Sequence, residues 1–188
     1  MSFTLTFNQL LVLASIAGLF LLYLWGIYNS FVITRNKVKT DFADIDVQLK
    51  RRAGLIENLV EIVKGYAKHE EETFENVAKA RSAVQSAPSP KQAAQADNML
   101  SSTLRSILAI SEAYPKLQAS ENFQRLQQDL KETEDIIAQY RETYNQTVMK
   151  YNTKLQVFPN LLFTGMFGFQ QEELFQPGEI SEVEIKMT

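Results

Sequence analysis

The sequence predicts an all-α protein, in which an N-terminal transmembrane helix continues into a long antiparallel helical bundle. Three observations predict this class. Residues 10–28 form one uninterrupted apolar run. In the rest of the chain, apolar residues recur at intervals of three and four, as on one face of a helix. The composition is rich in Ala, Leu, Gln, Glu and Lys and holds only 7 Gly and 5 Pro, a mix that favours helix.

The apolar run has the length of a membrane span. It reads LLVLASIAGLFLLYLWGIY, which makes about 28 Å of helix at 1.5 Å per residue. Aromatic residues lie at both ends, as at membrane interfaces: Phe3 and Phe7 at one end and Tyr23, Trp25 and Tyr28 at the other. A cleaved signal peptide is the alternative. It needs a basic start and a small-residue cleavage site, whereas residues 25–32 are bulky.

Charges beside the run predict its orientation. No Lys or Arg precedes it, and Arg35, Lys37 and Lys39 follow it at once. The positive-inside tendency therefore places the N-terminus outside and the large C-terminal region in the cytoplasm.

The first helix is predicted to run without a break from the membrane to about Ala87. No proline occurs before Pro88, and the segment SAPSPK then brings two prolines in three positions. Its first part carries an apolar stripe, here called the membrane-proximal stripe: Val38, Phe42, Ile45, Leu49, Ile56 and Leu59.

Two further helices follow. The second is expected from Gln92 to about Ala113, because Pro115 disfavours helix in the residue before it. The third is expected to start after Ser120 as N-cap and to keep three-four spacing until Pro159. Three amphipathic helices with short connections predict an antiparallel bundle.

The chain is thus expected to have three parts. Residues 1–34 are the N-terminal segment with the transmembrane helix at about 10–28, and residues 35–160 are the bundle. Residues 161–188 are packed on the bundle or partly disordered, with a short helix or a docked segment at 161–169. Alternation of Val183, Ile185 and Met187 with charged residues is a weak strand signal, and a frayed tail is the alternative.

The composition argues against several functions. A net charge of −3 without a basic face does not predict nucleic-acid binding. The absence of Cys excludes disulfides, thiolate metal sites and Cys nucleophiles. One histidine, His69, excludes a site that needs two imidazoles, and its place in KHEEE favours a solvated helix face over a metal ligand. No catalytic motif is present, so we predict no enzyme, cofactor or metal.

Several blocks of the sequence resemble one known family. IDVQLKRR at 45–52, NLVEIVKGYAKHE at 58–70, EAYPKLQASENFQRLQQDLKETED at 112–135 and YNQTVMKYN at 144–152 are similar to the LemA family, as are FPN at 158–160, FGF at 167–169 and LF at 174–175. The match covers nearly all of the chain after Tyr28.

The resemblance implies a single membrane anchor followed by a cytoplasmic helical bundle in bacteria, hence a location in the bacterial inner membrane. It implies no defined activity, but it suggests links to membrane organisation, including magnetosome formation in one branch. One position departs from the family: Glu57 stands where the family commonly has Pro. A proline there would kink the first helix, so the straight helix is favoured in this chain.

Three polar groups have competing interpretations. The only basic triplet is Lys50, Arg51 and Arg52, which fits salt bridges within a bundle or oligomer, a solvated face, or contact with lipid. Asn145 and Asn152 follow tyrosines one heptad apart, a spacing that favours a role in fixing helix register over ligand binding. The carboxylates of Asp129, Glu132, Glu134 and Asp135 are interpreted as solvated charge.

Helix lengths lead to the functional hypothesis. A first helix from residue 35 to 87 would be about 80 Å long and the second about 33 Å, so the membrane-proximal stripe would lack a full partner. We therefore expect a second copy or a partner helix to cover it, with these interaction candidates: Val38, Phe42, Ile45, Leu49, Lys50, Arg51, Arg52, Ile56 and Leu59. The rival is that the third helix or residues 159–188 fold back over it.

Two possible functions follow from this comparison of helix lengths. The first is a membrane scaffold that self-assembles as a homo-oligomer, by coiled-coil contacts of its helical region, and organises or shapes the membrane. The alternative is a monomeric adaptor or receptor that presents its bundle to a protein partner such as a membrane peptidase.

Overall fold

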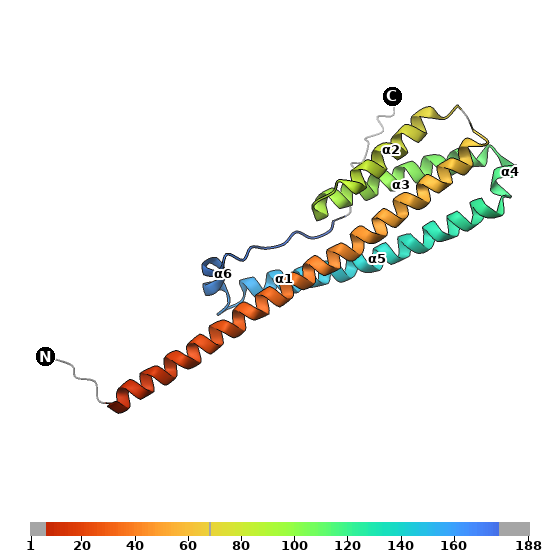
Figure 1. Ribbon diagram of the computed structural model, residues 1–188. Helices are drawn as coiled ribbons and strands as arrows, with labels where there is room; N and C mark the ends of the chain where they lie inside the picture. Colours follow the sequence, from red (N-terminus) through yellow and green to blue (C-terminus); the bar gives the residue numbers. More distant parts are fainter. Residues whose placement is uncertain (1–6, 68, 177–188) are drawn as a thin grey trace, which may run out of the picture.

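One very long helix organises the molecule. The computed structural model describes residues 7–67 and 69–176, and its first helix, α1, runs from Phe7 to Lys64 (Figure 1). Its 58 residues make about 87 Å of uninterrupted helix. It contains no proline, so every backbone N–H beyond its first turn has a partner within the helix. The apolar segment and the core-forming segment are therefore parts of the same helix.

The first helix ends earlier than the sequence predicted. The break comes at Gly65 and Tyr66, whose backbone N–H groups bond to Ile62 O at 3.2 Å and Val63 O at 2.9 Å as turns. A new helix, α2, then runs from Glu71 to Gln85 and folds back on α1. Glycine weakens a helix by about 1 kcal/mol relative to alanine, and carboxylates at the start of the next helix stabilise its N-terminus. The prediction of one helix to Ala87 was wrong.

The second and third predicted helices are confirmed. Helix α3, Pro90–Glu112, starts with Ser89 as N-cap, and the Ser89 hydroxyl accepts a hydrogen bond from Gln92 N at 3.3 Å. A four-residue helix, α4 (Pro115–Gln118), turns the chain at the far end of the bundle. Helix α5, Glu121–Gln156, then returns along the whole length of the bundle.

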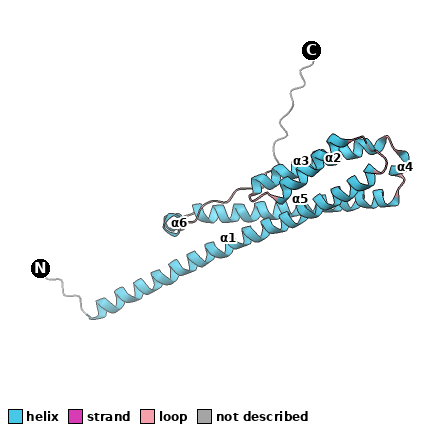
Figure 2. Cartoon of the chain, turned by 45° about the horizontal axis from the view of Figure 1, so that its top comes forward, coloured by secondary structure: helices cyan, strands magenta, loops and turns pink. Residues whose placement is uncertain are grey.

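The helices form an antiparallel bundle from which the N-terminal part of α1 projects; we call this projecting part the stem. Figures 1 and 2 show α5 lying along α1, with the α2–α3 hairpin packed on another side of α1. The α2–α3 hairpin stops short of the membrane-proximal part of α1, so there the bundle thins to α1, α5 and the residues after α5. The N-terminal part of α1 extends beyond the bundle as a single helix.

The buried core follows α1 from Ile27 to Val63 and is continuous with the other helices. Its largest fully buried side chains include aromatic residues from α1, α5 and the C-terminal segment, as well as aliphatic residues from α1, α3 and α4. They are Tyr144, Tyr151, Phe31, Phe123, Phe175, Ile45, Leu49, Ile56, Leu59, Leu100, Ile107 and Leu117. Removing this apolar surface from water is the main force that stabilises the bundle.

A short helix and an extended segment complete the described chain. Helix α6, Leu161–Phe167, ends at Gly168, which adopts a left-handed φ of 68° that glycine tolerates without strain. Residues 169–176 are extended and run back along α5. Of the two alternatives for 161–169, a short helix or a docked segment, the structure shows the short helix. The strand signal at 183–187 lies outside the described residues.

Candidate functional site at the membrane-proximal base of the bundle

The stem of α1 exposes the apolar face that a membrane would cover. In its most apolar 18-residue window, only 6% of the residues are buried. Most large apolar side chains there are more than half-exposed, among them Leu19, Leu22 and Trp25. By length and composition α1 is the one helix in the described part of the chain that can cross a membrane.

A loop between α5 and the extended segment packs beside this stem. We call residues 157–169, which include α6, the base loop. Its aromatic rings contact α1 in order: Phe163 lies 6.4 Å from Phe20 and Phe167 lies 5.4 Å from Tyr28, both centroid to centroid. Phe169 then contacts Phe31 at 5.1 Å. The loop thus descends along α1 and returns, reaching about 12 Å, or eight residues, beyond Tyr28.

The base loop has the composition of a membrane-inserted element. No charged residue occurs from residue 155 to 171. Several apolar side chains of the loop are directed outward: Phe158 is 80% exposed, Leu162 65% and Met166 64%. An apolar segment of this length is typical of a re-entrant or interfacial element rather than of a full span.

The backbone of the base loop is largely satisfied internally. Leu161 N bonds to Val157 O at 3.0 Å, and the amide of Asn160 donates to Lys154 O at 3.0 Å. At its end Phe169 N bonds to Thr164 O at 3.1 Å. Irregular backbone tolerates a low-dielectric surrounding only when its polar groups find such partners.

Lys154 joins α5 to α1 just above the loop. Its ammonium donates to Ser30 Oγ at 3.0 Å, Ser30 O at 3.4 Å and Thr34 Oγ1 at 2.6 Å. One turn further along α1, Arg35 Nε lies 3.4 Å from a carboxylate oxygen of Glu172 in the extended segment. Both α5 and the C-terminal segment are therefore tied to α1 where it leaves the bundle.

Two asparagines hold the extended segment on α5. Asn152 pairs with the backbone of Glu172, donating to its O at 2.9 Å and accepting from its N at 2.9 Å. Asn145 pairs with Phe175 in the same way, at 3.0 and 2.8 Å. The Tyr144 hydroxyl adds a bond to Glu173 O at 2.7 Å. The heptad spacing noted in the sequence therefore serves to dock the C-terminal segment, and the expected role in helix register was wrong.

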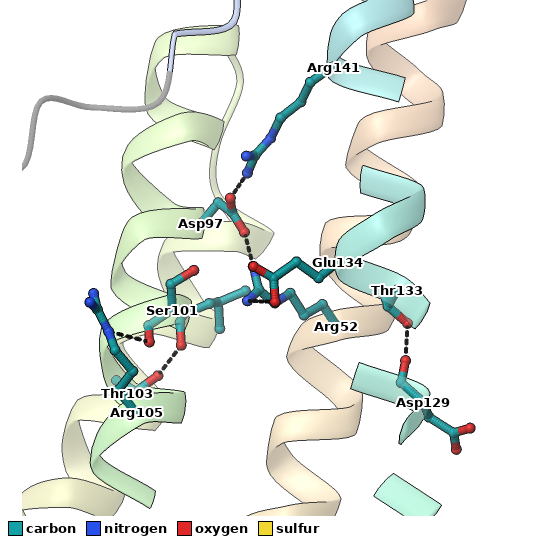
Figure 3. A network of polar contacts seen from close by, with 10 residues as sticks. Arg52, Asp97, Ser101, Thr103, Arg105, Asp129, Thr133, Glu134 and Arg141 are labelled. Carbon is teal, nitrogen blue, oxygen red and sulfur yellow. Dashed lines mark hydrogen bonds and ion pairs between the residues drawn. The ribbon is translucent and has the colours of Figure 1, made fainter. Parts of the chain in front are cut away.

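A buried group of charges lies further from the base, between α1, α3 and α5 (Figure 3). Arg52 Nη1 donates to Asp97 Oδ1 at 2.7 Å, and Arg141 contacts the other oxygen of Asp97. Glu134 adds a carboxylate oxygen 3.6 Å from Arg52 Nη2. Arg52 and Asp97 are each only 3% exposed, whereas the side chains of Arg141 and Glu134 are 24% and 63% exposed. A buried ion pair with two partly exposed partners therefore links the three helices.

Burial shifts the pKa values of groups in and beside this cluster. It lowers the pKa of the Arg52 guanidinium, an effect that the nearby Glu134 opposes. Burial, together with the positive charge of Arg52, lowers the pKa of Arg141 to about 10. Burial and the carboxylates of Glu172 and Glu173 raise the pKa of Tyr144 to about 12. These directions are those expected when charged forms lose hydration.

The membrane-proximal stripe is covered within the chain. Val38, Ile45, Leu49, Ile56 and Leu59 are at most 3% exposed, and Phe42 is partly buried and contacts Tyr144 of α5 at 5.9 Å. The expectation that the stripe lacks an intramolecular partner was wrong. The structure shows the alternative, in which the third predicted helix, α5, covers the stripe. Because α1 ends at Lys64, its part beyond residue 35 is only about 45 Å long, and the 36 residues of α5 span about 54 Å.

The basic triplet has two different roles. Arg52 is in the buried cluster, as the salt-bridge interpretation predicted. Lys50 is exposed and pairs with Asp46 at 2.6 Å one turn away. Arg51 is exposed as well. Of the nine interaction candidates, only Lys50 and Arg51 are exposed.

Comparison with known proteins identifies the family. The profile of the LemA family matches residues 41–187. The chain belongs to the LemA family. The match begins inside α1, beyond its apolar segment, and it includes α5 and the base loop.

Curated relatives of this LemA chain include proteins of two kinds. Magnetosome protein MamQ 2 of Paramagnetospirillum magneticum is 25% identical over 175 residues, covering 79% of this chain and 64% of the relative. Magnetosome protein MamQ of Magnetospirillum gryphiswaldense is 25% identical, covering 89% and 72%. Protein LemA of Metamycoplasma hominis is 22% identical, covering 89% and 77%. The chain thus spans less than two thirds of the length of the first of these relatives. The family and the apolar helix together support a membrane-associated helical protein.

The family resemblance seen in the sequence corresponds to specific structural roles. The block at 45–52 supplies Ile45, Leu49 and Arg52 to the core of the LemA bundle. The block at 144–152 supplies the asparagines that dock the extended segment. Within the described residues, no cluster of three or more His, Cys, Asp or Glu side chains forms a metal site.

Proposed function

We propose that this LemA protein is a membrane-anchored adaptor: it holds a rigid helical bundle at the bacterial inner membrane and presents the polar surface of that bundle to a protein partner. The N-terminus lies outside and the bundle in the cytoplasm, since Arg35, Lys37 and Lys39 follow the apolar segment. The base loop forms a second membrane element that dips beside α1 to about the depth of Phe20.

The continuity of α1 is the observation that carries this proposal. The helix that crosses the membrane is the same helix that buries Phe31, Ile45 and Ile56 in the bundle core. Lys154, the base loop and the Arg35–Glu172 pair then fasten α5 and the C-terminal segment to α1 at the membrane surface. A flexible linker would let the bundle swivel, whereas this attachment fixes its direction and height relative to the membrane.

A monomeric adaptor is favoured over a self-assembling scaffold because the core is closed within one chain. The apolar stripe, which was the reason to expect a second copy, is covered by α5. Self-assembly remains the second candidate on one observation: the membrane segment exposes the small residues Ala14 and Gly18, four apart, and no atom lies near a Cβ built at Gly18. Such spacing allows close contact between two helices in a membrane.

The proposal includes no catalytic step. Four hollows within the described residues lie at the base of the bundle, between α2 and α3, and beside the N-terminal end of α1, and none of these four is lined by His, Asp or Glu. His69 is exposed at the connection between α1 and α2. The family and its named relatives carry no enzyme name.

The mass of the full-length protein in mild detergent tests the choice between the two functions. Size exclusion with light scattering, after subtraction of the detergent, is expected to give one chain of 21.5 kDa. A discrete species of many copies would refute the monomeric adaptor. The double variant Ala14→Leu, Gly18→Leu would then show whether the copies meet through the membrane segment.

Orientation is tested separately. The chain has no Cys, so a single Met149→Cys variant carries the only thiol, on an exposed face of α5. In intact cells this thiol is expected to resist a membrane-impermeant maleimide and to react only after lysis. Labelling of intact cells would reverse the proposed orientation.

A further inference from the structure

Two hollows meet at the base of the bundle. One, of about 290 Å³, lies against α1 and is lined by Tyr23, Gly26, Ile27, Ser30, Phe31, Lys154 and Asn160. The other, of about 670 Å³, lies along the end of α5 and is lined by Gln146, Met149, Lys150, Thr153, Lys154, Val157 and Asn160. Because both include Lys154 and Asn160, they adjoin each other at these two side chains.

The hollows lie at the level of lipid headgroups. The apolar segment of α1 ends near Tyr28, and Lys154 reaches Ser30 and Thr34 within the next two turns. With α1 crossing the membrane, the wall formed by Tyr23, Gly26 and Ile27 faces the hydrocarbon just below that level.

Positive charge gathers at this place without a matching carboxylate. The three oxygens that accept hydrogen bonds from Lys154 belong to a backbone carbonyl and two hydroxyls, all neutral. Lys150, one turn earlier on α5, is exposed and has no hydrogen-bond or ion-pair partner within the described residues. Two other cations near the base are paired with carboxylates, Arg35 with Glu172 and Lys37 with Asp41.

The wall on the membrane side is apolar and open. Gly26 contributes no side chain, and a Cβ built at this position would meet no atom within 4 Å. Ile27 and Val157 line the two sides of the hollow. The site therefore joins an apolar wall, directed toward the membrane, to two lysines at its surface.

We propose that these joined hollows bind a phospholipid with an anionic headgroup. The exposed ammonium group of Lys150 donates to the phosphate, and Lys154, whose N–H groups are directed to Ser30 and Thr34, attracts the phosphate by its positive charge. An acyl chain lies against Gly26, Ile27 and Val157. Basic pockets at membrane-facing helix junctions are suited to anionic lipid headgroups. The inference rests on the membrane anchoring proposed above, but not on the adaptor role.

Lipid titration of the full-length protein tests this site. Protein in a non-ionic detergent is titrated with dioleoyl phosphatidylglycerol, dioleoyl phosphatidylcholine or inorganic phosphate, while bound lipid is counted by native mass spectrometry and the thermal midpoint is followed. Phosphatidylglycerol is expected to bind and to raise the midpoint, and the other two are expected to have little effect.

The variants separate the site from general attraction of charge. Lys150→Gln and Lys154→Gln should each weaken phosphatidylglycerol binding about fivefold, the effect of one lysine near an anionic lipid surface. Lys116→Gln, at the far end of the bundle, makes the same charge change and should leave binding unaltered. Lys150 has no described intramolecular partner, so its variant reports binding even if Lys154→Gln disturbs the fold. Gly26→Leu should block the apolar wall and abolish binding with both lysines intact.

Three results would overturn the proposal. Equal binding of phosphatidylcholine would remove the role of the anionic headgroup. An equal effect of inorganic phosphate would assign the site to a free anion. Equal weakening by Lys116→Gln would reduce it to non-specific attraction. A multi-copy mass with intact, lysine-dependent lipid binding would refute the adaptor role alone.

Discussion

The buried charges around Asp97 make a quantitative prediction possible. Asp97 is 3% exposed and accepts from Arg52 with one oxygen and contacts Arg141 with the other. Replacing it with alanine leaves the buried Arg52 guanidinium with only Glu134, at 3.6 Å, and leaves the partly exposed Arg141 without a carboxylate. Breaking a buried pair by removing one partner costs about 3–5 kcal/mol. We expect Asp97→Ala to lower the free energy of unfolding by about 4 kcal/mol.

The expected change in the thermal midpoint follows from this stability loss and the chain length. For a protein of this size about 2–4 °C of thermal midpoint corresponds to 1 kcal/mol, so the midpoint of Asp97→Ala should fall by roughly 8–16 °C. Circular dichroism of the full-length protein in mild detergent measures this. Asp46→Ala is the matched control, because it removes an aspartate from a more exposed pair with Lys50 and should cost less than about 1 kcal/mol.

A second experiment asks whether the charged cluster contributes to the net stability of the fold. Replacing the buried pair together with the partly exposed Arg141, as Arg52→Met, Asp97→Leu and Arg141→Leu, leaves no buried charge without a partner. Such apolar replacements of buried ion pairs are often neutral or stabilising, so we expect the triple variant to be much more stable than Asp97→Ala. If Asp97→Ala loses no more stability than Asp46→Ala, the reasoning about this buried cluster is refuted.

Two further predictions concern the C-terminal segment. Asn145→Ala should speed amide hydrogen exchange at Phe175, and Asn152→Ala should speed it at Glu172, because each variant removes the acceptor of that N–H. The control Asn76→Ala, at an exposed position, should leave both exchange rates unchanged. Unchanged exchange in the first two variants would contradict the docking role. Tyr144 gives a pH dependence: its folded pKa of about 12 lies above its ordinary value of 10.0, so the folded state holds more protons between these values and stability falls as pH rises through that window. Urea unfolding of Tyr144→Phe from pH 9 to 12 should show a shallower fall than the unmodified protein, and an equal fall would argue against the raised pKa.

The sequence predicted the elements whose signals are local. The apolar segment at 10–28, the stop before Pro115 and the start after Ser120 each depend on a few adjacent residues. The break after Lys64 does not. It is marked by no proline, and a single glycine costs a helix only about 1 kcal/mol, less than the packing of α2 on α1 can contribute. Because this break was missed, the predicted first helix was too long. The membrane-proximal stripe was therefore expected to lack the partner that α5 provides.

The candidate site depended on contacts between distant residues. Arg52 and Asp97 are 45 positions apart, and Asn145 and Phe175 are 30 apart. Periodicity showed that Arg52 and Asn145 lie on helices, but not what they face. The base loop did leave a signal that sequence reasoning missed, namely the absence of any charge from residue 155 to 171, directly after a lysine-containing helix end.

The depth of the base loop tests the central claim of this account most directly. Met166 in the loop and Met149 on α5 are 64% and 61% exposed in the protein, so neither is shielded by other parts of the chain. Each is changed to Cys in this Cys-free protein, spin-labelled, and reconstituted in phospholipid vesicles, and its relaxation by dissolved oxygen and by a water-soluble nickel chelate is measured. The loop is predicted to lie in the membrane, with the label at 166 relaxed by oxygen and protected from the chelate, and the label at 149 relaxed by the chelate. Equal access of the chelate to both labels would contradict it.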